Sequence, residues 1–541
     1  MTAHAEARPP APPAGTPEPP ATTAARPSPR PSLFDIIFVI WAVVVPVGFG
    51  YRLLNSDGDL ARHLRVGEIM LQRGALLRED LFSHTMGGRS FLAFEWGSEV
   101  VYAAVYRAAG LAGVAIFAGL LLALTYALLV RFLIRHGGDP LLAYVIGMAA
   151  AVLSAAHWLA RPHLFTMLGV VVLLELLERQ SRRTLWPYVP LFILWANFHG
   201  GFFYGCILIG LYAVGDVAEG LASGDRAPWL ARGRHHAAAL GIALLASLVN
   251  PNGFQLLAHV AGFFGNNAIL TQTQEFMSPN FHTVNGKIFL LALLGVMAGL
   301  ALSRRRPTFP VLLVLLANVA FALISQRNIE LFALVALPLV ALHLDAEWRA
   351  LPVLQRAKAV FQREHAGSYS GLSAAVVSGL LIVLGLQRGT VAGVEVVPDR
   401  FDGKAFPVAA VERARAEDLD GRLFNYFIWG GYLIHQWPEQ RVFIDGATDF
   451  YGEQLFKDYL RVWNLEPGWH EVFRQREISL TLVPPQSRLA HELVRDLDWT
   501  IWYCDSTAAI LRQPAADGAA SASRSTDSAL TRCGAAPPGR P

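Results

Sequence analysis

Charged residues are scarce in this sequence: only 16% of its 541 residues are Asp, Glu, Lys or Arg, while 53% are hydrophobic. Soluble domains usually carry about a quarter charged residues, so an ordinary soluble protein of this length is excluded. The formal net charge of +3 is too small to indicate a nucleic-acid partner. Cysteine is also rare. Cys206, Cys504 and Cys533 stand far apart without a CxxC pair, so neither a zinc site nor a disulfide framework is indicated.

The hydrophobic residues are gathered in long runs. LFDIIFVIWAVVVPVGFG, GVAIFAGLLLALTYALLV and GLSAAVVSGLLIVLGL each approach the roughly 20 apolar residues that cross a bilayer. Similar runs along the chain predict about eleven membrane spans. We place them near residues 33–53, 112–131, 140–157, 163–178, 186–198, 201–219, 236–249, 287–303, 309–325, 328–343 and 371–387.

The pattern changes at both ends of the apolar region, residues 32–390. Residues 1–31 are rich in Pro, Ala and Thr, and residues 514–541 in Ala, Ser, Gly and Pro, so both are predicted to be disordered tails. Residues 395–513 alternate strand-like pieces such as ISLTLVP with helical pieces such as LAHELVRDL. The sequence therefore predicts an α-helical polytopic membrane protein with a C-terminal soluble α/β domain.

The basic residues predict the orientation of the spans. With the N-terminus in the cytoplasm, most Lys and Arg clusters lie inside, and the later outer connections contain only Arg161 and Arg327. The first outer loop, residues 54–96, is the exception because it holds five arginines. It is long, and long segments obey the positive-inside rule less strictly. An odd number of spans then places the C-terminal domain outside.

The outer connections, unlike the basic inner ones, hold unusual polar clusters. They are SDGDLARH, FEWGSE, HWLARPH, NFHGG, NPNG, QEFMSPNFH and QRN. Polar groups at membrane depth are costly and face protein or a watery cavity. We therefore expect these clusters to converge on one polar site at the outer face.

The first-loop stretch SDGDLARHLRVGEIMLQRGALLREDLFSH…FLAFEWGSEV, with ARPH, NFHGG and NPNG downstream, resembles the GT-C superfamily of membrane glycosyltransferases. Bacterial members of this kind are similar to protein mannosyltransferases and aminoarabinose transferases. The resemblance covers about residues 33–390, and NYFIWGGYLIHQWPEQRVFIDGATDFYG looks like the outer domain of those proteins. It implies a GT-C-like domain in the bacterial inner (plasma) membrane, among membrane lipids. It also implies transfer of a sugar from a polyprenyl-phosphate-linked donor to an unknown lipid, polysaccharide or protein acceptor.

Such a transfer needs a base for the acceptor hydroxyl or amine. The resemblance points to Asp57 and Asp59, Asp57 being preferred because it lies just past the first span. The alternative is a solvated turn, since Gly58 between two aspartates is a turn signal. We expect Glu95 to face Asp57, where two carboxylates could bind a divalent cation or raise each other's pKa. Its alternative is a carboxylate at a helix start. No other cofactor is indicated, and metal ligands are unknown.

The leaving phosphate needs positive charge. Arg161 and Arg327 suit this role, because arginine holds phosphate with two parallel hydrogen bonds; their alternative is to reach the lipid headgroups. Further candidates for substrate binding share the outer connections with them: His63, His163, Asn197, His199, Gln274 and Glu275. Histidine and asparagine at helix ends are also common as structural residues that cap or cross-link helices.

The outer domain offers a second candidate site. FIDGATDFYG places Asp445 and Asp449 at the end of an expected strand, where α/β sheets often build sites. WGGYL weakly resembles the tryptophan–aspartate–tyrosine acceptor motif of oligosaccharyltransferases, but it lacks the central aspartate. A glycine turn with local packing is therefore the simpler interpretation of Gly430, Gly431 and Tyr432.

Two other functions compete with a transferase. A transporter or flippase is disfavoured because the two halves of the chain show no matched pair of Gly/Pro-broken spans. A scaffold that keeps a GT-C-like shell without activity is not distinguished by the sequence. The arrangement of Asp57, Glu95, Arg161 and Arg327 separates these possibilities, because a scaffold would scatter them.

Overall fold

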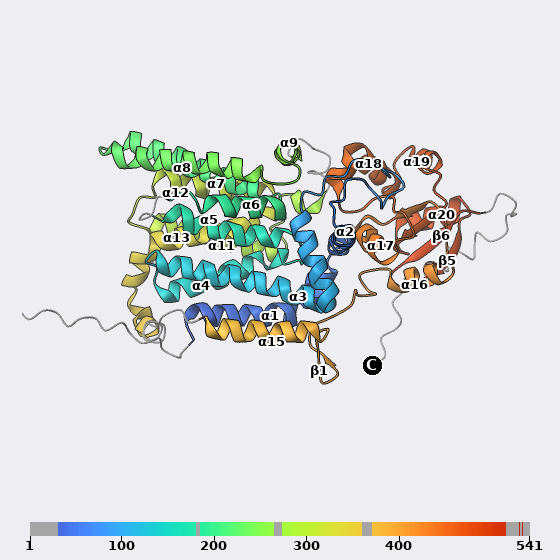
Figure 1. Cartoon of the computed structure of the whole chain (residues 1–541), viewed down its shortest axis with the longest axis horizontal. Coiled ribbons are helices and arrows are strands. Elements are labelled where there is room, and N and C mark those ends of the chain that lie inside the picture. The colour runs from blue at the N-terminus through green and yellow to red at the C-terminus, as the bar shows by residue number, and fades with distance from the viewer. Residues whose placement is uncertain are drawn as a thin grey trace, which may run out of the picture.

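The computed structural model describes residues 31–179, 184–263, 273–359 and 371–514, together with Leu530 and Cys533. The two predicted disordered tails fall almost entirely outside the described residues. The chain has two parts (Figure 1): a bundle of helices that run roughly side by side, and a smaller domain containing a sheet at one end of that bundle.

Apolar helices build the bundle. Within the described residues, each of the eleven predicted spans coincides with one helix. These helices are α1 (Leu33–Asn55), α3 (Trp96–Arg135), α4 (Pro140–Ser154), α5 (His163–Glu178), α6 (Tyr188–Phe198), α7 (Phe202–Ala222), α8 (Arg226–Ser247), α11 (Val284–Leu302), α12 (Phe309–Ile324), α13 (Ile329–Ala350) and α15 (Leu372–Leu386).

Length and composition qualify six of these helices, in the described part of the chain, to cross a membrane. They are α1, α3, α7, α11, α4 with the short helix η1 (Ala155–His157), and α13 with η3 (Gln326–Asn328). Helices α6, α12 and α15 are apolar but shorter. Helix α5 has 16 residues and ends with Glu175 and Glu178, and the first half of α8 carries three arginines. The chain is thus a multi-pass membrane protein, but eleven crossings are not confirmed.

Helix α3 changes direction at Gly110, whose φ of 66° and ψ of −162° are not helical. Glycine adopts positive φ without a steric penalty. A Cβ at this position would also lie 2.3 Å from a carboxylate oxygen of Asp399. The break separates the buried predicted span, 112–131, from the first part of α3, residues 96–109.

The remaining elements lie at the end of the bundle or in the smaller domain. Those in the connections are α2 (Asp59–Arg73), α9 (Phe254–Phe263), η2 (Gln274–Phe276), η4 (Pro352–Leu354), β1 (Thr390–Val391) and β2 (Val394–Glu395). The smaller domain contains α16 (Val408–Ala416), β3 (Leu423–Asn425), η5 (Phe427–Trp429), α17 (Gly430–Gln436), α18 (Thr448–Trp463), α19 (Trp469–Gln475), β4 (Leu480–Val483), α20 (Arg488–Asp496), β5 (Thr500–Cys504) and β6 (Ala509–Arg512). We call it the outer domain.

The sheet of the outer domain has the strand order β3-β4-β6-β5. Strands β3 and β4 are parallel, and the other two pairs are antiparallel. The strand expected to end at Asp445, within RVFIDG (441–446), is not formed in the described structure, so this prediction is wrong. Val442 instead makes a bridge to Ser83 of the first loop, and the backbone N–H of Phe443 donates to the side chain of Asn425 (2.8 Å). Side-chain and loop partners thus replace a sheet ladder here.

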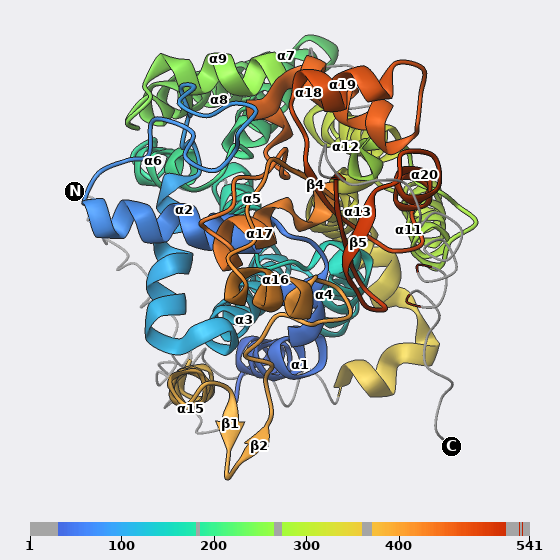
Figure 2. The same ribbon diagram turned by 90° about the vertical axis from the view of Figure 1, so that its right-hand side faces the viewer.

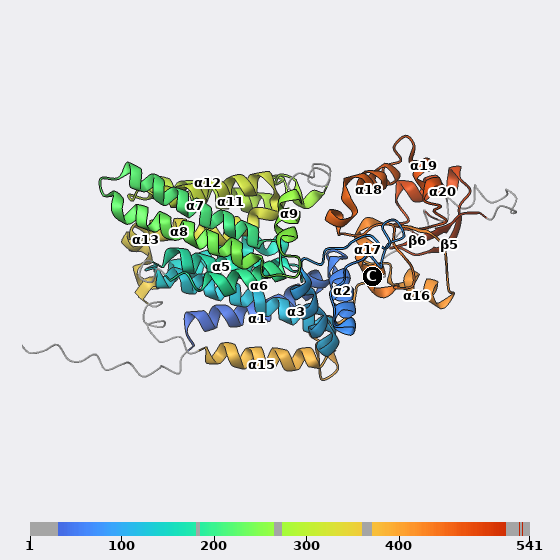
Figure 3. The same ribbon diagram turned by 45° about the horizontal axis from the view of Figure 1, so that its top comes forward.

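The outer domain docks on α2, which lies between it and the bundle (Figure 3). Figure 2 views the molecule from the side of the outer domain, with the bundle behind it. A Cβ on Gly431 of α17 would lie 2.2 Å from the carbonyl oxygen of Gly58, so the two backbones are in direct contact. Arg62 of α2 pairs with Asp445 at 3.2 Å, and both side chains are buried. Although burial opposes charging, Asp445 raises the pKa of Arg62 above its ordinary value. The contact between the two parts therefore includes a buried ion pair beside close backbone packing.

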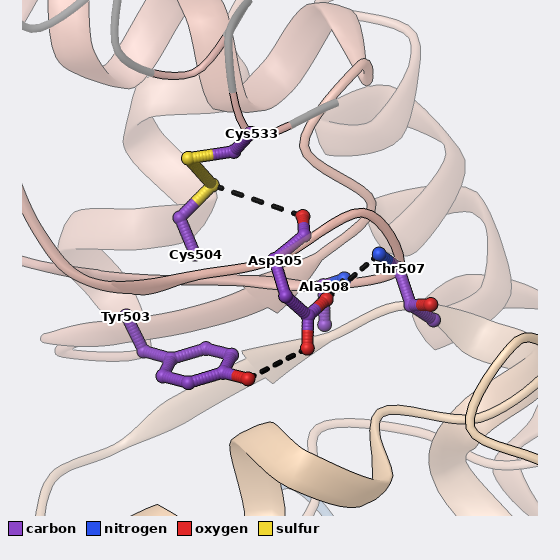
Figure 4. The surroundings of a disulfide bond; sticks show 6 residues. All are labelled: Tyr503, Cys504, Asp505, Thr507, Ala508 and Cys533. Carbon is purple, nitrogen blue, oxygen red and sulfur yellow. Dashed lines mark hydrogen bonds between the residues drawn. A yellow bond between two sulfur atoms is a disulfide. The ribbon is translucent and has the colours of Figure 1, made fainter. Parts of the chain in front are cut away.

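A disulfide joins Cys504, the last residue of β5, to Cys533 (Figure 4), with Cα atoms 5.9 Å apart. The expectation of no disulfide is wrong, because the fold returns residue 533 to β5 across 29 residues of sequence. Next to it, the Asp505 carboxylate accepts hydrogen bonds from the Tyr503 hydroxyl and the Thr507 N–H (both 2.7 Å). Disulfides persist in oxidising compartments, which agrees with an extracytoplasmic outer domain.

The disulfide predicts how the cysteines react. In protein purified without reductant and then denatured, a maleimide should modify one cysteine per chain, the free Cys206, and three after reduction. Intact-protein mass spectrometry counts the adducts. Three adducts without reductant would contradict both the disulfide and an oxidising compartment.

The Arg62–Asp445 pair predicts how the outer domain is held. Arg62→Met leaves a buried carboxylate unpaired, which typically costs about 3–5 kcal/mol, so the thermal unfolding midpoint in detergent should fall clearly. The double variant with Asp445→Leu should be less destabilised than the sum of the two single variants. Arg415→Met is the matched control, because Arg415 and its partner Glu439 are both about half exposed or more. Equal shifts for Arg62→Met and Arg415→Met would show that the buried pair contributes nothing.

Candidate functional site

The site begins at the tight turn that joins α1 to α2. The backbone N–H of Asp59 donates to a carboxylate oxygen of Asp57 (3.1 Å), the short-range bond expected of an aspartate turn. The carboxylates of Asp57 and Asp59 are 24% and 19% exposed, so neither is fully solvated. The predicted turn is therefore present, but it is half-buried at the end of the bundle.

Arg161, from the link between η1 and α5, holds both aspartates. Its Nη1 lies 3.1 Å from Asp57 Oδ2, and its Nη2 lies 2.5 Å from Asp59 Oδ2. The same Nη1 is 3.3 Å from Glu275 Oε1. One guanidinium thus joins carboxylates from two connections that lie far apart in sequence.

Glu275 extends this cluster to Arg327, at 3.8 Å. Although burial opposes it, Arg161 and Arg327 lower the pKa of Glu275 to about 2. Arg327 also lies over the ring of Phe276, 5.4 Å from its centroid. Hydrogen bonds hold the segments η2 and η3 together. In one of them, the side-chain amide of Gln326 donates to the backbone carbonyl of Gln274 (2.5 Å). The side chain of Gln274 is exposed.

The pKa of Asp57 changes in the opposite direction to that of Glu275, because burial outweighs the nearby arginine. Desolvation raises its pKa to about 6, against the attraction of Arg161. The neighbouring charges of Asp59 and Glu275 raise the pKa further. Asp57 is thus a carboxyl group poised to exchange a proton near neutral pH, as a general base must be.

Glu95 lies in a second group with two histidines. His63 Nε2 is 3.9 Å from one carboxylate oxygen of Glu95, and His199 Nε2 is 3.5 Å from the other. His63 Nδ1 is 3.0 Å from Glu99, which is buried. Burial raises the pKa of Glu95 to about 7, opposed by His63 and reinforced by Glu99.

The environment of His199 decides where its proton lies. The Gly201 N–H donates to Nδ1 (3.0 Å), and the Trp195 indole donates to the Thr166 hydroxyl (2.8 Å), leaving that hydroxyl to donate to the same Nδ1 (2.7 Å). Burial lowers the pKa of His199 well below its ordinary value. The imidazole is therefore neutral with its proton on Nε2, the nitrogen that faces Glu95.

The outer domain closes one side of the aspartate turn. A Cβ on Gly446 would lie 1.8 Å from an Asp59 carboxylate oxygen, so only glycine allows this approach. Asp445, next to it, accepts from the Ala447 N–H (2.7 Å) and the Tyr451 hydroxyl (2.8 Å). The two candidate sites predicted separately, in the first loop and in the outer domain, are therefore neighbours.

Asp449 makes another link between the domains. It is 3.0 Å from His259 of α9, and the His259 ring lies 5.0 Å from that of Phe94. Although burial opposes it, His259 lowers the pKa of Asp449.

Two other predicted site residues, His163 and Asn197, make hydrogen bonds within the helix bundle. His163 Nε2 faces the carbonyl of His157 (2.8 Å) in a buried position. Asn197 accepts from the Trp96 indole (2.7 Å) and donates to the carbonyls of Ile193 and Val249. Asn197 therefore cross-links helices, the alternative that the sequence left open.

The glycine-rich WGGYL segment is also a packing element. The Trp429 indole donates to the Ala405 carbonyl (2.9 Å), and Tyr432 is buried against Phe401 and Phe406. A Cβ on Gly430 would lie 2.4 Å from the Ile444 carbonyl oxygen. The packing interpretation of this segment therefore holds.

Three residues that sequence reasoning passed over belong to or border the site: Glu99, Arg62 and Glu330. The signal for Glu99 was its spacing of four from Glu95, which places both on one face of a helix start. Glu330 is 5% exposed, and one of its oxygens has no hydrogen-bond partner within the described part of the chain. The sequence feature that could have identified Glu330 is a carboxylate in an apolar helix, three residues after Arg327.

The arrangement does not favour a metal ion. Among the described residues, no group of three or more His, Cys, Asp or Glu side chains is placed to hold one. The carboxylates of Asp57, Asp59 and Glu275 do converge, but they converge on the guanidinium of Arg161. That cation fills the position between them that a divalent cation would need.

No protein-family model matches the sequence, and no curated protein matches it. Solved structures match it by fold. The crystal structure of the Archaeoglobus fulgidus oligosaccharyltransferase in the apo form has a TM-score of 0.52 and 12% identity, over 90% of this chain and 74% of that chain. An archaeal oligosaccharyltransferase from the same organism, in complex with an inhibitory peptide and a dolichol-phosphate, has a TM-score of 0.52 and 12% identity, over 84% and 69%.

A third structure, the Archaeoglobus fulgidus oligosaccharyltransferase tethered with an acceptor peptide containing the NVT sequon, has a TM-score of 0.51 and 13% identity. It covers 85% of this chain and 69% of that chain. These matches extend over both the helix bundle and the outer domain. The chain therefore shares the fold of these archaeal oligosaccharyltransferases, which agrees with the fold that the first-loop resemblance to the GT-C superfamily implied.

Proposed function

We propose that the chain is a glycosyltransferase that moves a sugar from a polyprenyl-phosphate-linked donor to an acceptor at the outer face of a bacterial inner membrane. One observation carries the proposal. The Asp57–Arg161–Glu275–Arg327 chain of ion pairs lies where the bundle meets the outer domain, in the fold of an oligosaccharyltransferase. Matched structures hold a dolichol-phosphate or an acceptor peptide. A protein is therefore the first acceptor to test, before a lipid or a polysaccharide.

Asp57 is the proposed base. Its carboxylate takes the proton from the acceptor hydroxyl or amine, and the oxygen or nitrogen thus freed attacks the anomeric carbon of the sugar. The bond between that carbon and the phosphate oxygen breaks, and its electron pair leaves with the lipid phosphate. Asp59 is less suited, because Arg161 is only 2.5 Å away and Gly446 packs against its carboxylate.

The two arginines divide their roles. Arg161 shares its charge among three carboxylates, so we assign it to positioning them. Within the described residues, Arg327 has one carboxylate at ion-pair distance, that of Glu275, at 3.8 Å. Its guanidinium therefore keeps more of its charge for the leaving phosphate, which it can bind with two hydrogen bonds.

The sugar is assigned to the group around Glu95. The carboxylate of Glu95 accepts hydrogen bonds from sugar hydroxyls, the Nε2–H of His199 can donate one, and the imidazole of His63 can also form one. Gln274, exposed beside Glu275, is assigned to the acceptor entrance. A divalent cation would have to displace the Arg161 guanidinium, and no step of this reaction is routed through one.

The gathering of these groups weighs against the competing functions. A scaffold gives no reason to bury several charged groups together, since each costs free energy unless it is paired. A transporter places its binding site near the bilayer midplane, between repeats. The junction of α1 and α2, which carries Asp57 and Asp59, instead lies at one end of the bundle, next to the outer domain (Figure 3).

Asp57→Asn tests the base. Purified protein in detergent is incubated with a panel of radiolabelled polyprenyl-phosphate sugars, and transfer to acceptor is measured. Loss of a general base typically costs about 10²–10⁴-fold, so the wild type should release sugar and Asp57→Asn should be nearly inactive. Asp498→Asn is the control, because Asp498 is exposed and its φ of 55° suits asparagine. No turnover by folded wild-type protein with any donor would favour the scaffold.

The pH profile tests which carboxylate is the base. The base must be unprotonated, so kcat/KM should fall as the pH drops below about 6, the value to which burial raises the pKa of Asp57. Glu95→Gln should keep this acidic limb. A limb near pH 7 that disappears in Glu95→Gln would move the role to Glu95, whose pKa burial raises to about 7.

A further inference from the structure

A cavity of about 600 Å³ lies at the end of the bundle opposite the outer domain. It opens among the ends of α3, α5, α11, α12 and α13 and has no part in the proposed transfer. Its lining consists of basic, acidic and apolar side chains: Arg135, His136, Glu175, Glu178, Arg179, Arg305, Val311, Leu339, Leu342 and His343. Its volume is within the range of small-ligand sites, about 300–1,000 Å³.

The lining has an excess of positive charge. Its three arginines and two histidines face only two glutamates. Glu175 alone is shared by Arg135 (3.1 Å), Arg179 (3.1 Å) and His136 (3.4 Å). Glu178 accepts a hydrogen bond from the Tyr212 hydroxyl (2.5 Å), and no described cation pairs with it. The glutamates therefore do not neutralise the arginines around them.

Arg305 shows this excess most clearly. Within the described residues, its guanidinium has no carboxylate at ion-pair distance, whereas Arg135 and Arg179 each have Glu175. Glu347, the nearby acid of α13, accepts the backbone N–H of Arg304 instead (2.8 Å). Arg305 attracts Glu347 at longer range, but within the described chain no carboxylate at ion-pair distance occupies its hydrogen-bond donors at the rim of the cavity.

The rest of the lining is apolar. Val311 and Leu339 are 8% and 2% exposed, and Leu342 continues the same wall along α13. A ligand that satisfies both parts carries an anionic group beside Arg305 and a hydrocarbon chain along α12 and α13. A free phosphate or nucleotide would leave the apolar wall unused. The cavity also lies at a bundle end, where the headgroups of a bilayer lie.

We propose that this cavity binds the phosphodiester headgroup of an anionic phospholipid, with Arg305 donating hydrogen bonds to the phosphate. Basic pockets between membrane helices bind acidic headgroups in this way. The sequence analysis places this end in the cytoplasm, whose leaflet is rich in anionic lipid. The proposal does not depend on the proposed function, because the two sites lie at opposite ends of the bundle.

Lipid retention tests the proposal. Delipidated full-length protein in detergent is titrated with phosphatidylglycerol or with phosphatidylcholine of the same acyl chains, and bound lipid is counted by native mass spectrometry. Phosphatidylglycerol should bind more tightly. Arg305→Gln should weaken its binding about tenfold, the effect of losing one contact to a charged group, and should leave phosphatidylcholine unchanged. Arg305→Gln leaves no carboxylate unpaired, so it should fold as the wild type does.

Arg306→Gln is the matched control. Arg306 is the next residue, stacks over Phe309 at 5.2 Å and does not line the cavity. If Arg305→Gln and Arg306→Gln weaken phosphatidylglycerol binding equally, the loss is explained by general surface charge and the proposal is overturned. Equal affinity of the wild type for the two lipids would also overturn it. Soluble glycerophosphoglycerol forms the third arm: if it displaces the lipid at equal concentration, the site binds free phosphate esters and the lipid assignment is wrong.

Discussion

The site depends on one guanidinium. Arg161 is within 3.3 Å of carboxylates from the turn after α1 and from η2, segments that nothing else in the local sequence brings together. Carboxylates gathered away from water repel each other and lose hydration, so they need a buried cation between them. Without Arg161, Asp57, Asp59 and Glu275 would separate or take up protons. The arginine thereby fixes both the geometry of the cluster and the charge state of its members.

The outer domain places a second constraint on the same turn. Gly446 packs against the Asp59 carboxylate, and Gly431 packs against the Gly58 backbone, so Asp59 is confined between Arg161 and the domain. The buried pair of Arg62 with Asp445 holds α2 in place behind it. The outer domain is therefore a wall of the site. Movement of this domain would alter the aspartates before any other group of the cluster.

Much of this arrangement could be predicted from the sequence, because it follows from local signals. Long apolar runs placed the helices, and polar clusters on one set of connections indicated one site. The partners could not be predicted. Arg161 was expected at a phosphate but lies among acids, and the expected strand at 441–446 is replaced by contacts to Asn425 and the first loop. The Cys504–Cys533 disulfide was likewise missed. All three depend on contacts between distant residues, which spacing along the chain does not encode.

Arg161, Arg327 and Arg305 differ in how many carboxylates surround them, and this number distinguishes their proposed roles better than their positions in the sequence do. Arg161 has three carboxylates within 3.3 Å, Arg327 has one at 3.8 Å, and Arg305 has none at ion-pair distance within the described chain. A guanidinium can hold a phosphate only with charge and donors that are not already used. The capacity to bind phosphate therefore rises from Arg161 to Arg327 to Arg305. Arg161 is consequently the residue that orders the cluster of carboxylates, and the phosphate-binding roles proposed for Arg327 and Arg305 follow from the donors that the protein leaves less paired.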